Sequence, residues 1–125
     1  MKFKKTKDKK LYLSGYSDSD WAGDKVSGKS TTGYVIFING TPIVWQSKKQ
    51  PIVAQSAFEA EIIALCSLVT QLIYIRKILK FLGFKVEKPI YAFCDNQSAI
   101  KSFKENHNTK KSRHMNVRYH KKKNT

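Results

Sequence analysis

The sequence predicts an α/β domain in which helices flank a mixed sheet of three antiparallel strands and a parallel fourth. Strand-like runs fill the chain before residue 56, and apolar residues then recur at three- and four-residue steps as far as Leu82. An apolar run at residues 90–94 follows, and a helical crossover of that length can place it parallel to an earlier strand. The 125 residues are expected to form one domain over 11–120, between a basic lead at 1–10 and a basic tail at 121–125.

Three strands are expected in the first part of the chain. The stretch "LYLSGYSD" alternates apolar with small or polar residues from Leu11 to Asp18, and the Gly- and Ser-rich "SDWAGDKVSGKSTTG" is typical of a loop. The run "YVIFING" is rich in β-branched and aromatic residues, "NGT" is a hairpin signal, and "PIVWQS" reads as the returning strand. Together they predict an antiparallel β-meander.

The period changes at Ser56, where a long helix is predicted. Ser56 and Glu59 have the spacing of a capping box, and Gly83 lies where a C-terminal cap is expected. Beyond this helix, "IYAFC" predicts a fourth strand and the residues after Asp95 a helix to about Lys104. A short helix is predicted for residues 112–120.

The net charge of +15 indicates a polyanionic partner. Residues 1–10, 11–84 and 85–125 carry net charges of +5, +2 and +8, so basic ends surround a nearly neutral middle. Lysine and arginine that neutralise phosphates release counterions, which favours nucleic acid as the partner. The alternatives are a solubilising basic surface and an acidic membrane surface, although neither end has a clean amphipathic helix.

Composition also argues against several classes of protein. Cys66 and Cys94 sit inside apolar runs without metal-ligand spacing, so we expect small core residues in a reducing intracellular compartment, cytoplasmic or nuclear. Charged and polar residues interrupt the apolar run of the long helix, so no membrane span is expected. The lysine-rich start lacks the apolar region of a signal peptide.

Three of the nine acidic residues fall where a core element begins or ends. Asp18 ends the first strand, Asp95 ends the fourth, and Glu61 projects from the apolar face of the long helix. Parallel strands end at the same edge of a sheet, so the two aspartates can meet there. For Asp95 taken alone, however, a helix cap is the simpler interpretation.

Clustered carboxylates repel each other unless a divalent cation neutralises them, and a site made only of oxygen ligands favours Mg²⁺ or Mn²⁺. Two such ions about 4 Å apart can cleave a phosphodiester. For the histidines at 107, 114 and 120 we favour surface or phosphate-contact roles over metal ligation, because no second soft ligand accompanies them.

Consecutive motifs from about Leu13 to His120 resemble one known family. The run "GYSDSDWAGD…KSTTGYVIFING…IVWQSKKQPIVAQSAFEAEIIAL…IYAFCDNQSAI…SRHMNVRYH" resembles the ribonuclease H domain of the Pol polyprotein of copia-type retrotransposons. The resemblance implies a ribonuclease H-like fold that cleaves the RNA strand of an RNA–DNA hybrid with two Mg²⁺ (or Mn²⁺) ions. It implies that Asp18 bridges both metals and that Glu61 and Asp95 complete their shells.

The sequence departs from the family pattern at two places. Members of the family read His-Ile-Asp where this chain has His114, Met115 and Asn116, a position expected on a helix. In the family a fifth strand and a last helix follow, and that helix brings a fourth aspartate to the metals. The chain is expected to lack both, with impaired cleavage as the consequence.

Two other functions stay open at this stage: a non-catalytic nucleic-acid-binding module, and a non-functional relic of a transposon. The expected partners are an RNA–DNA hybrid and the reverse transcriptase domain of the parent polyprotein. The residues assigned to nucleic-acid contact are Lys48, Lys49, Asn96, Gln97, Arg113, His114 and Arg118.

Overall fold

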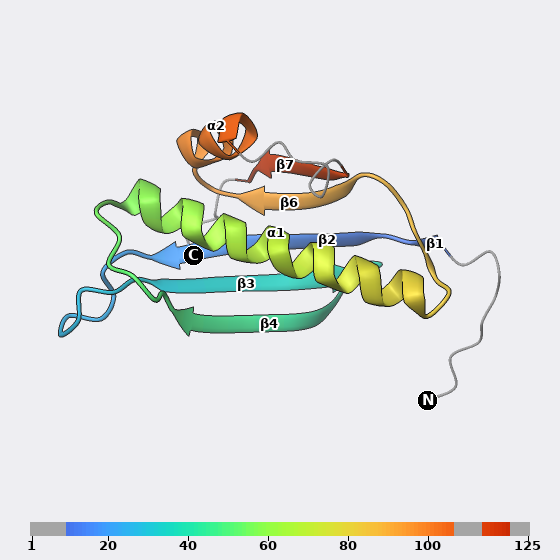
Figure 1. Cartoon of the computed structure of the whole chain (residues 1–125), viewed down its shortest axis with the longest axis horizontal. Helices are drawn as coiled ribbons and strands as arrows, with labels where there is room; N and C mark the ends of the chain where they lie inside the picture. Colours follow the sequence, from blue (N-terminus) through green and yellow to red (C-terminus); the bar gives the residue numbers. More distant parts are fainter. Residues whose placement is uncertain (1–9, 107–113, 121–125) are drawn as a thin grey trace.

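The computed structural model describes residues 10–106 and 114–120, and it places a long helix across one face of a five-stranded mixed sheet (Figure 1). The strand order is β4-β3-β2-β6-β7. Its members are β2 (Leu13–Asp20), β3 (Thr31–Ile38), β4 (Thr41–Lys49), β6 (Ile90–Cys94) and β7 (Met115–Tyr119). β2, β3 and β4 are antiparallel neighbours, and β6 runs parallel to β2, so the predicted arrangement of the first four strands is confirmed.

The first strand is longer than predicted and does not end at Asp18. β2 continues to Asp20, because residues taken for a loop form the start of β3. Asp18 pairs with Gly33 and Ser19 with Thr32, so the β-branched threonines extend the ladder by two residues. The expectation that Asp18 is the last residue of its strand is therefore wrong, although Asp18 still lies near the C-terminal end.

The predicted helix at 112–120 and the predicted absence of a fifth strand are both wrong. Residues 115–119 form β7, parallel to β6, while 112 and 113 lie outside the described residues. The Ile90 N–H donates to the His114 carbonyl and the His120 N–H to the Cys94 carbonyl, so β7 satisfies the free edge of β6. Val117 is buried, and Asn116 lies on this strand and not on a helix.

Helix α1 (Ala57–Phe81) begins and ends as predicted. The Ser56 hydroxyl accepts the Glu59 N–H at 3.2 Å, and the Glu59 carboxylate accepts the Gln55 N–H at 3.1 Å. Gly83 follows the last turn with φ of +92°, a left-handed conformation that glycine adopts without strain. By length and composition α1 could also cross a membrane; its buried residues lie against the sheet.

A two-stranded sheet and a second helix complete the described part of the chain. β1 (Lys10–Leu11) and β5 (Lys85–Val86) form a separate two-stranded parallel sheet beside the end of α1, which the sequence did not predict. Helix α2 (Gln97–Asn106) follows β6 and buries Ala99, Ile100 and Phe103. Figure 1 shows α2 beside the start of α1, above β6 and β7.

The core lies between α1 and the sheet, where helix and strand approach closely at Gly15. A Cβ atom at Gly15 would lie 2.6 Å from Leu68 Cδ1 and 3.2 Å from the Val35 carbonyl oxygen. Leu68 itself is fully buried. The missing side chain therefore lets α1 pack directly onto the centre of β2.

We expect Gly15→Ala to destabilise the fold by about 1–3 kcal/mol, because the new methyl group overpacks this contact. Gly33→Ala is the matched control: a Cβ there would lie 3.8 Å from the nearest atom, an ordinary contact distance. Urea denaturation of the two variants measures the difference. Equal stability of both would contradict the close packing of α1 on β2.

Candidate metal centre

Glu61 is the buried carboxylate at the start of α1, with 7% of its surface exposed. Ser19 at the end of β2 donates twice to Glu61 Oε1, through its backbone N–H at 3.1 Å and through its hydroxyl. The Cys94 thiol lies 3.6 Å from the other oxygen, Oε2. Both carboxylate oxygens therefore have donors from the sheet, which fixes the orientation of the side chain.

The surroundings of Glu61 disfavour its ionised form. Burial raises the pKa of Glu61, and the negative charges of Asp95 and Asp18 and a hydrogen bond to Asp95 raise it further, whereas the Ser19 hydroxyl lowers it. Burial also raises the pKa of the Cys94 thiol to about 11, so Cys94 is protonated at neutral pH and can donate to Glu61. A divalent cation would relieve the repulsion among the three carboxylates.

Asp95 lies immediately after β6 and beside Glu61. Ligand atoms of Glu61, Cys94 and Asp95 all lie within 4.8 Å of one another. The cap of α2 is the next residue: Asn96 Oδ1 accepts the Ala99 N–H at 2.9 Å, and the Asn96 carbonyl accepts the Ile100 N–H. The interpretation of Asp95 as the helix cap is therefore wrong, and its side chain belongs to the acidic cluster.

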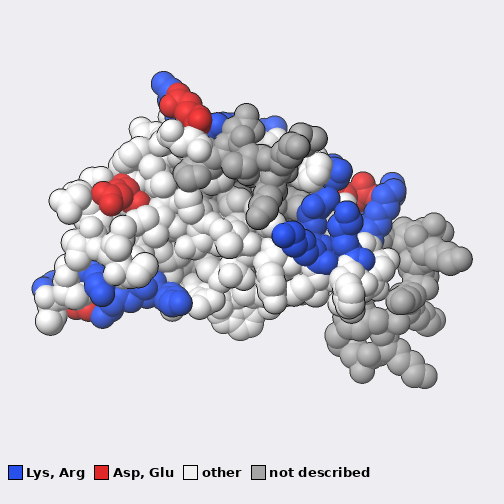
Figure 2. All heavy atoms as spheres, viewed as in Figure 1, with Lys and Arg blue, Asp and Glu red and all other residues white. Residues whose placement is uncertain are grey.

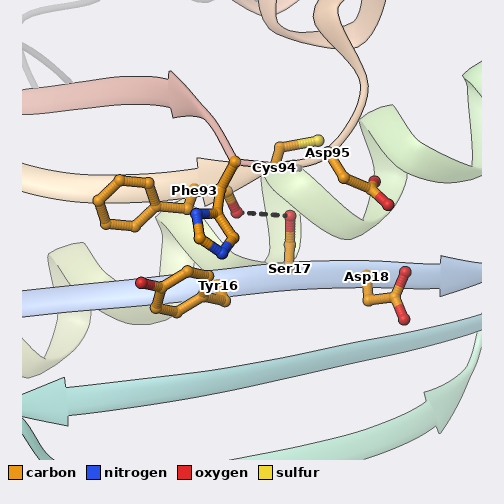
Figure 3. Close-up of a pocket in the computed structure, with 7 residues that line it drawn as sticks. Tyr16, Ser17, Asp18, Phe93, Cys94 and Asp95 are labelled. Carbon is orange, nitrogen blue, oxygen red and sulfur yellow. Dashed lines mark hydrogen bonds between the residues drawn. The ribbon is translucent and has the colours of Figure 1, made fainter. Parts of the chain in front are cut away.

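Asp18 joins the cluster from β2. Its Oδ1 accepts the Ser19 N–H at 3.0 Å, and Glu61 Oε1 accepts the same N–H, so one donor holds two carboxylates close together. Asp18 and Asp95 also line one cavity of about 320 Å³ on the face of the sheet opposite α1; its other walls are Tyr16, Ser17, Phe93, Cys94 and His120. Figure 3 shows the two carboxylates beyond the aromatic rings, at the ends of β2 and β6.

These three carboxylates suit a hard divalent cation. They come from β2, from α1 and from the residue that follows β6, and their oxygens are the ligands that Mg²⁺ and Mn²⁺ prefer. Sequence reasoning found all three, but it missed Ser19 and assigned Cys94 only to the core. Strand alternation places Cys94 on the helix side of β6, but nothing in the sequence indicates that Ser19 would reach Glu61 with both donors.

The residues assigned to nucleic-acid contact lie in several places. Lys48 and Lys49 are exposed at the end of β4, and Lys49 pairs with Asp24, which holds the pKa of that carboxyl well below its usual range. Asn96 and Gln97 lie at the start of α2 next to Asp95. These positions are consistent with contact near the cluster, and the contact itself stays a prediction.

The remaining assigned residues lie at β7. Arg118 is exposed, with its guanidinium carbon 5.7 Å from the centre of the Tyr91 ring, a cation–π geometry. His114 precedes β7 and its carbonyl accepts a strand hydrogen bond. Arg113 lies outside the described residues.

Fold and site together define an α/β protein with a carboxylate centre at the C-terminal ends of two parallel strands. No family model matches the chain. It is 42% identical over 108 residues to the Retrovirus-related Pol polyprotein from transposon TNT 1-94 of Nicotiana tabacum, covering 86% of this chain and 8% of that protein. It is 40% identical over 89 residues to the corresponding polyprotein from transposon RE1 of Arabidopsis thaliana, covering 71% and 6%.

The homologues of this chain are therefore transposon Pol polyproteins, and the chain spans only 6% to 8% of the length of these two relatives. The expected relationship to retrotransposon Pol is confirmed at this level. Among solved structures, Marinitoga piezophila Argonaute in complex with a guide RNA aligns over 92% of this chain and 17% of that chain, at 16% identity and a TM-score of 0.45. A likeness at that level carries no argument about the fold.

Proposed function

We propose that this chain is a ribonuclease H domain of a copia-type Pol polyprotein, which cleaves the RNA strand of RNA–DNA hybrids with divalent metal. The observations that carry the proposal are the closeness of the Glu61 and Asp95 carboxylates and the Ser19 N–H, which both Asp18 and Glu61 accept. The mixed sheet and its flanking helices agree with a ribonuclease H-like fold.

Asp18, Glu61 and Asp95 would hold the metal ions. When bound, Mg²⁺ supplies an activated water and stabilises the charge that develops on the phosphate. The chain's own contribution is orientation: Ser19 and Cys94 each contact one oxygen of Glu61, so this carboxylate does not have to reorganise when substrate arrives. Lys48 and the exposed Arg118 would attract the phosphate backbone of the hybrid.

The second candidate is a nucleic-acid-binding module without catalysis. The net charge of +15 supports binding by itself and requires no chemistry at the carboxylates. The two functions differ in their requirement for divalent metal. Cleavage requires the metal, whereas phosphate contacts by lysine and arginine do not. For either function we propose a reducing intracellular setting, in agreement with the two free cysteines, and the reverse transcriptase domain of the same polyprotein as a partner.

Cleavage of an end-labelled hybrid by the 125-residue chain tests the proposal. We expect RNA fragments from the hybrid in Mg²⁺ or Mn²⁺, none in EDTA, and no cleavage of the DNA strand. Single-stranded RNA and double-stranded RNA of the same sequence are the controls. Salt-sensitive binding without cleavage in either metal would favour the binding module, and cleavage in EDTA would contradict both the metal and the carboxylate roles.

A further inference from the structure

The Cys94 thiol lies among the carboxylates of the candidate metal centre, and the proposed function gives it no metal to bind. Cys94 is the last residue of β6 and is 1% exposed. Ligand atoms of Cys94, Glu61 and Asp95 all lie within 4.8 Å of one another. A thiol changes which ions such a site prefers, because thiolate sulfur selects ions such as Zn²⁺, whereas Mg²⁺ and Mn²⁺ prefer oxygen.

The distance between the sulfur and the nearest carboxylate oxygen fits a tetrahedral zinc ion. Zinc binds cysteine sulfur at about 2.3 Å and carboxylate oxygen at about 2.0–2.2 Å, so the tetrahedral angle places these two ligand atoms about 3.6 Å apart. Cys94 Sγ and Glu61 Oε2 are 3.6 Å apart in the structure. Asp95 is the least buried of the three residues and follows the end of β6, so its side chain has room to rotate toward the same ion.

A cavity gives an ion access to these ligands. Cys94 and Asp95 both line the cavity of about 320 Å³ that Asp18 shares. Three protein ligands leave the fourth position of a tetrahedral ion to water, and the cavity has the volume to hold it. The arrangement therefore provides three ligands, an entry path and an open position.

Within residues 10–106 and 114–120, this is the one place where three such ligand atoms come so close. Cys66, the other cysteine, is half-buried on α1 and belongs to no such group among those residues. On the face of the molecule seen in Figure 2, acidic side chains are few and lie apart from one another. A zinc-type ion is therefore expected at one site, and Cys66 provides a matched control.

We propose that Glu61, Cys94 and Asp95 form a tetrahedral zinc site, in which Zn²⁺ replaces Mg²⁺ at the carboxylates and blocks cleavage. The block rests on the proposed function, whereas zinc binding itself does not require that the chain cleave anything. Burial raises the pKa of the Cys94 thiol to about 11, so the thiol gives its proton to the solvent when the sulfur binds the ion. Mg²⁺ leaves because Zn²⁺ takes the oxygens of Glu61 and Asp95.

Titration with Co²⁺ tests the ligand set, since Co²⁺ occupies zinc sites and a cobalt–thiolate bond gives a near-ultraviolet charge-transfer band that oxygen ligands do not give. The 125-residue chain is kept reduced without thiol reagents. We expect a saturable band in the wild type, its absence in Cys94→Ser and its retention in Cys66→Ser. Stoichiometric Zn²⁺ should abolish the band.

Three results of this titration would overturn the proposal: no band in the wild type, a band that persists in Cys94→Ser, or a band that is lost in Cys66→Ser. Thermal unfolding shows first whether each variant folds. If Cys94→Ser does not fold, Glu61→Gln decides, because it keeps the thiol and removes a ligand. Its Co²⁺ affinity should fall by about tenfold or more, the size of effect seen even for residues around metal ligands, and an unchanged affinity would overturn the proposal.

Competition with Mn²⁺ tests whether the two kinds of ion share the carboxylates. Addition of Zn²⁺ should release bound Mn²⁺, followed by the electron paramagnetic resonance signal of free Mn²⁺. In Cys94→Ser the affinity for Zn²⁺ should fall by about tenfold or more relative to the affinity for Mn²⁺, since sulfur is a ligand of zinc alone. Zinc binding without release of Mn²⁺, or equal losses for the two ions in Cys94→Ser, would contradict the shared site.

Cleavage assays of the same proteins separate this inference from the proposed function. Zn²⁺ should inhibit the wild type more strongly than Cys94→Ser, each compared with its own rate in Mg²⁺. If the wild type cleaves the hybrid but shows no band that depends on Cys94, the zinc site fails and the ribonuclease function stands. If the band depends on Cys94 but no protein cleaves, the zinc site stands and the ribonuclease function fails.

Discussion

Replacing Asp95 with asparagine is expected to lower Mg²⁺-dependent cleavage of the RNA strand by about two orders of magnitude or more, the scale seen when one stabilising group is removed from an active site. Asparagine keeps the shape of the side chain but removes the charge that would hold the metal. Asp20→Asn is the matched control, since Asp20 is an exposed carboxylate two residues from Asp18. The measurement is the initial rate on end-labelled hybrid at saturating Mg²⁺.

The same substitution should not weaken the metal-free fold. Burial raises the pKa of Glu61 and the charge of Asp95 raises it further, so the folded protein holds the Glu61 proton more tightly than the unfolded chain does. For an acid with a raised pKa, stability falls as the pH rises through that pKa, and the loss persists at neutral pH. Asp95→Asn removes part of this repulsion, so we expect an unchanged or higher unfolding temperature in EDTA at pH 7.

Two outcomes would contradict this account of Asp95. Full cleavage by Asp95→Asn would exclude the residue from the catalytic site. A clear loss of stability in EDTA would indicate that Asp95 has a structural role, such as the helix cap that the structure instead assigns to Asn96.

The second large effect is expected at the contact between α1 and the sheet. Leu68 is fully buried on α1 and faces Gly15 of β2, so Leu68→Ala should destabilise the fold by about 2–5 kcal/mol through lost burial and the cavity that remains. Urea denaturation measures this change. Because α1 also carries Glu61, loss of this packing should loosen the carboxylate cluster as well.

Phe81→Ala is the control for Leu68→Ala, since Phe81 lies on the same helix with 90% of its surface exposed. Its effect should stay within about 0.5 kcal/mol. If the two variants lost equal stability, α1 would not be packed on the sheet as described.

The parts of the fold that the sequence predicts well have strong local signals. The long helix combines a capping box, a sustained three-to-four residue period and a glycine with positive φ, and its observed bounds agree closely. The first three strands are also found, although the first ends two residues later and the second begins three residues earlier than predicted. Thr31 and Thr32 have high strand propensity, but the Gly- and Ser-rich context around them resembles a loop.

The fifth strand was missed because its stability comes from its neighbour. The stretch "MNVRY" is short and polar on one side, and only the open edge of β6 makes an extended conformation favourable there. The pairing of β1 with β5 was missed for the same reason, since two residues on each side carry no periodicity. Such pairings depend on tertiary contacts, which a local pattern does not contain.

The sequence predicted the carboxylates of the candidate site but not the contacts that support them. Strand ends and helix periodicity were sufficient to propose that Asp18, Glu61 and Asp95 meet. The double donation from Ser19 and the contact from Cys94 depend on the relative placement of β2, α1 and β6, which only the structure gives. Asn96 caps α2, one residue after Asp95. Both residue types are common helix caps, so composition does not distinguish the two positions.

Direct measurement of metal binding tests the central claim, that Asp18, Glu61 and Asp95 form one metal centre. Titration of Mn²⁺ into the 125-residue chain, followed by the electron paramagnetic resonance signal of free Mn²⁺, should show saturable binding. Glu61→Gln should weaken it by about tenfold or more, since even residues around metal ligands have effects of that size. Asp20→Asn should bind as the wild type does. Equal Mn²⁺ affinity in the wild type and Glu61→Gln, or no saturable binding in the wild type, would contradict the claim.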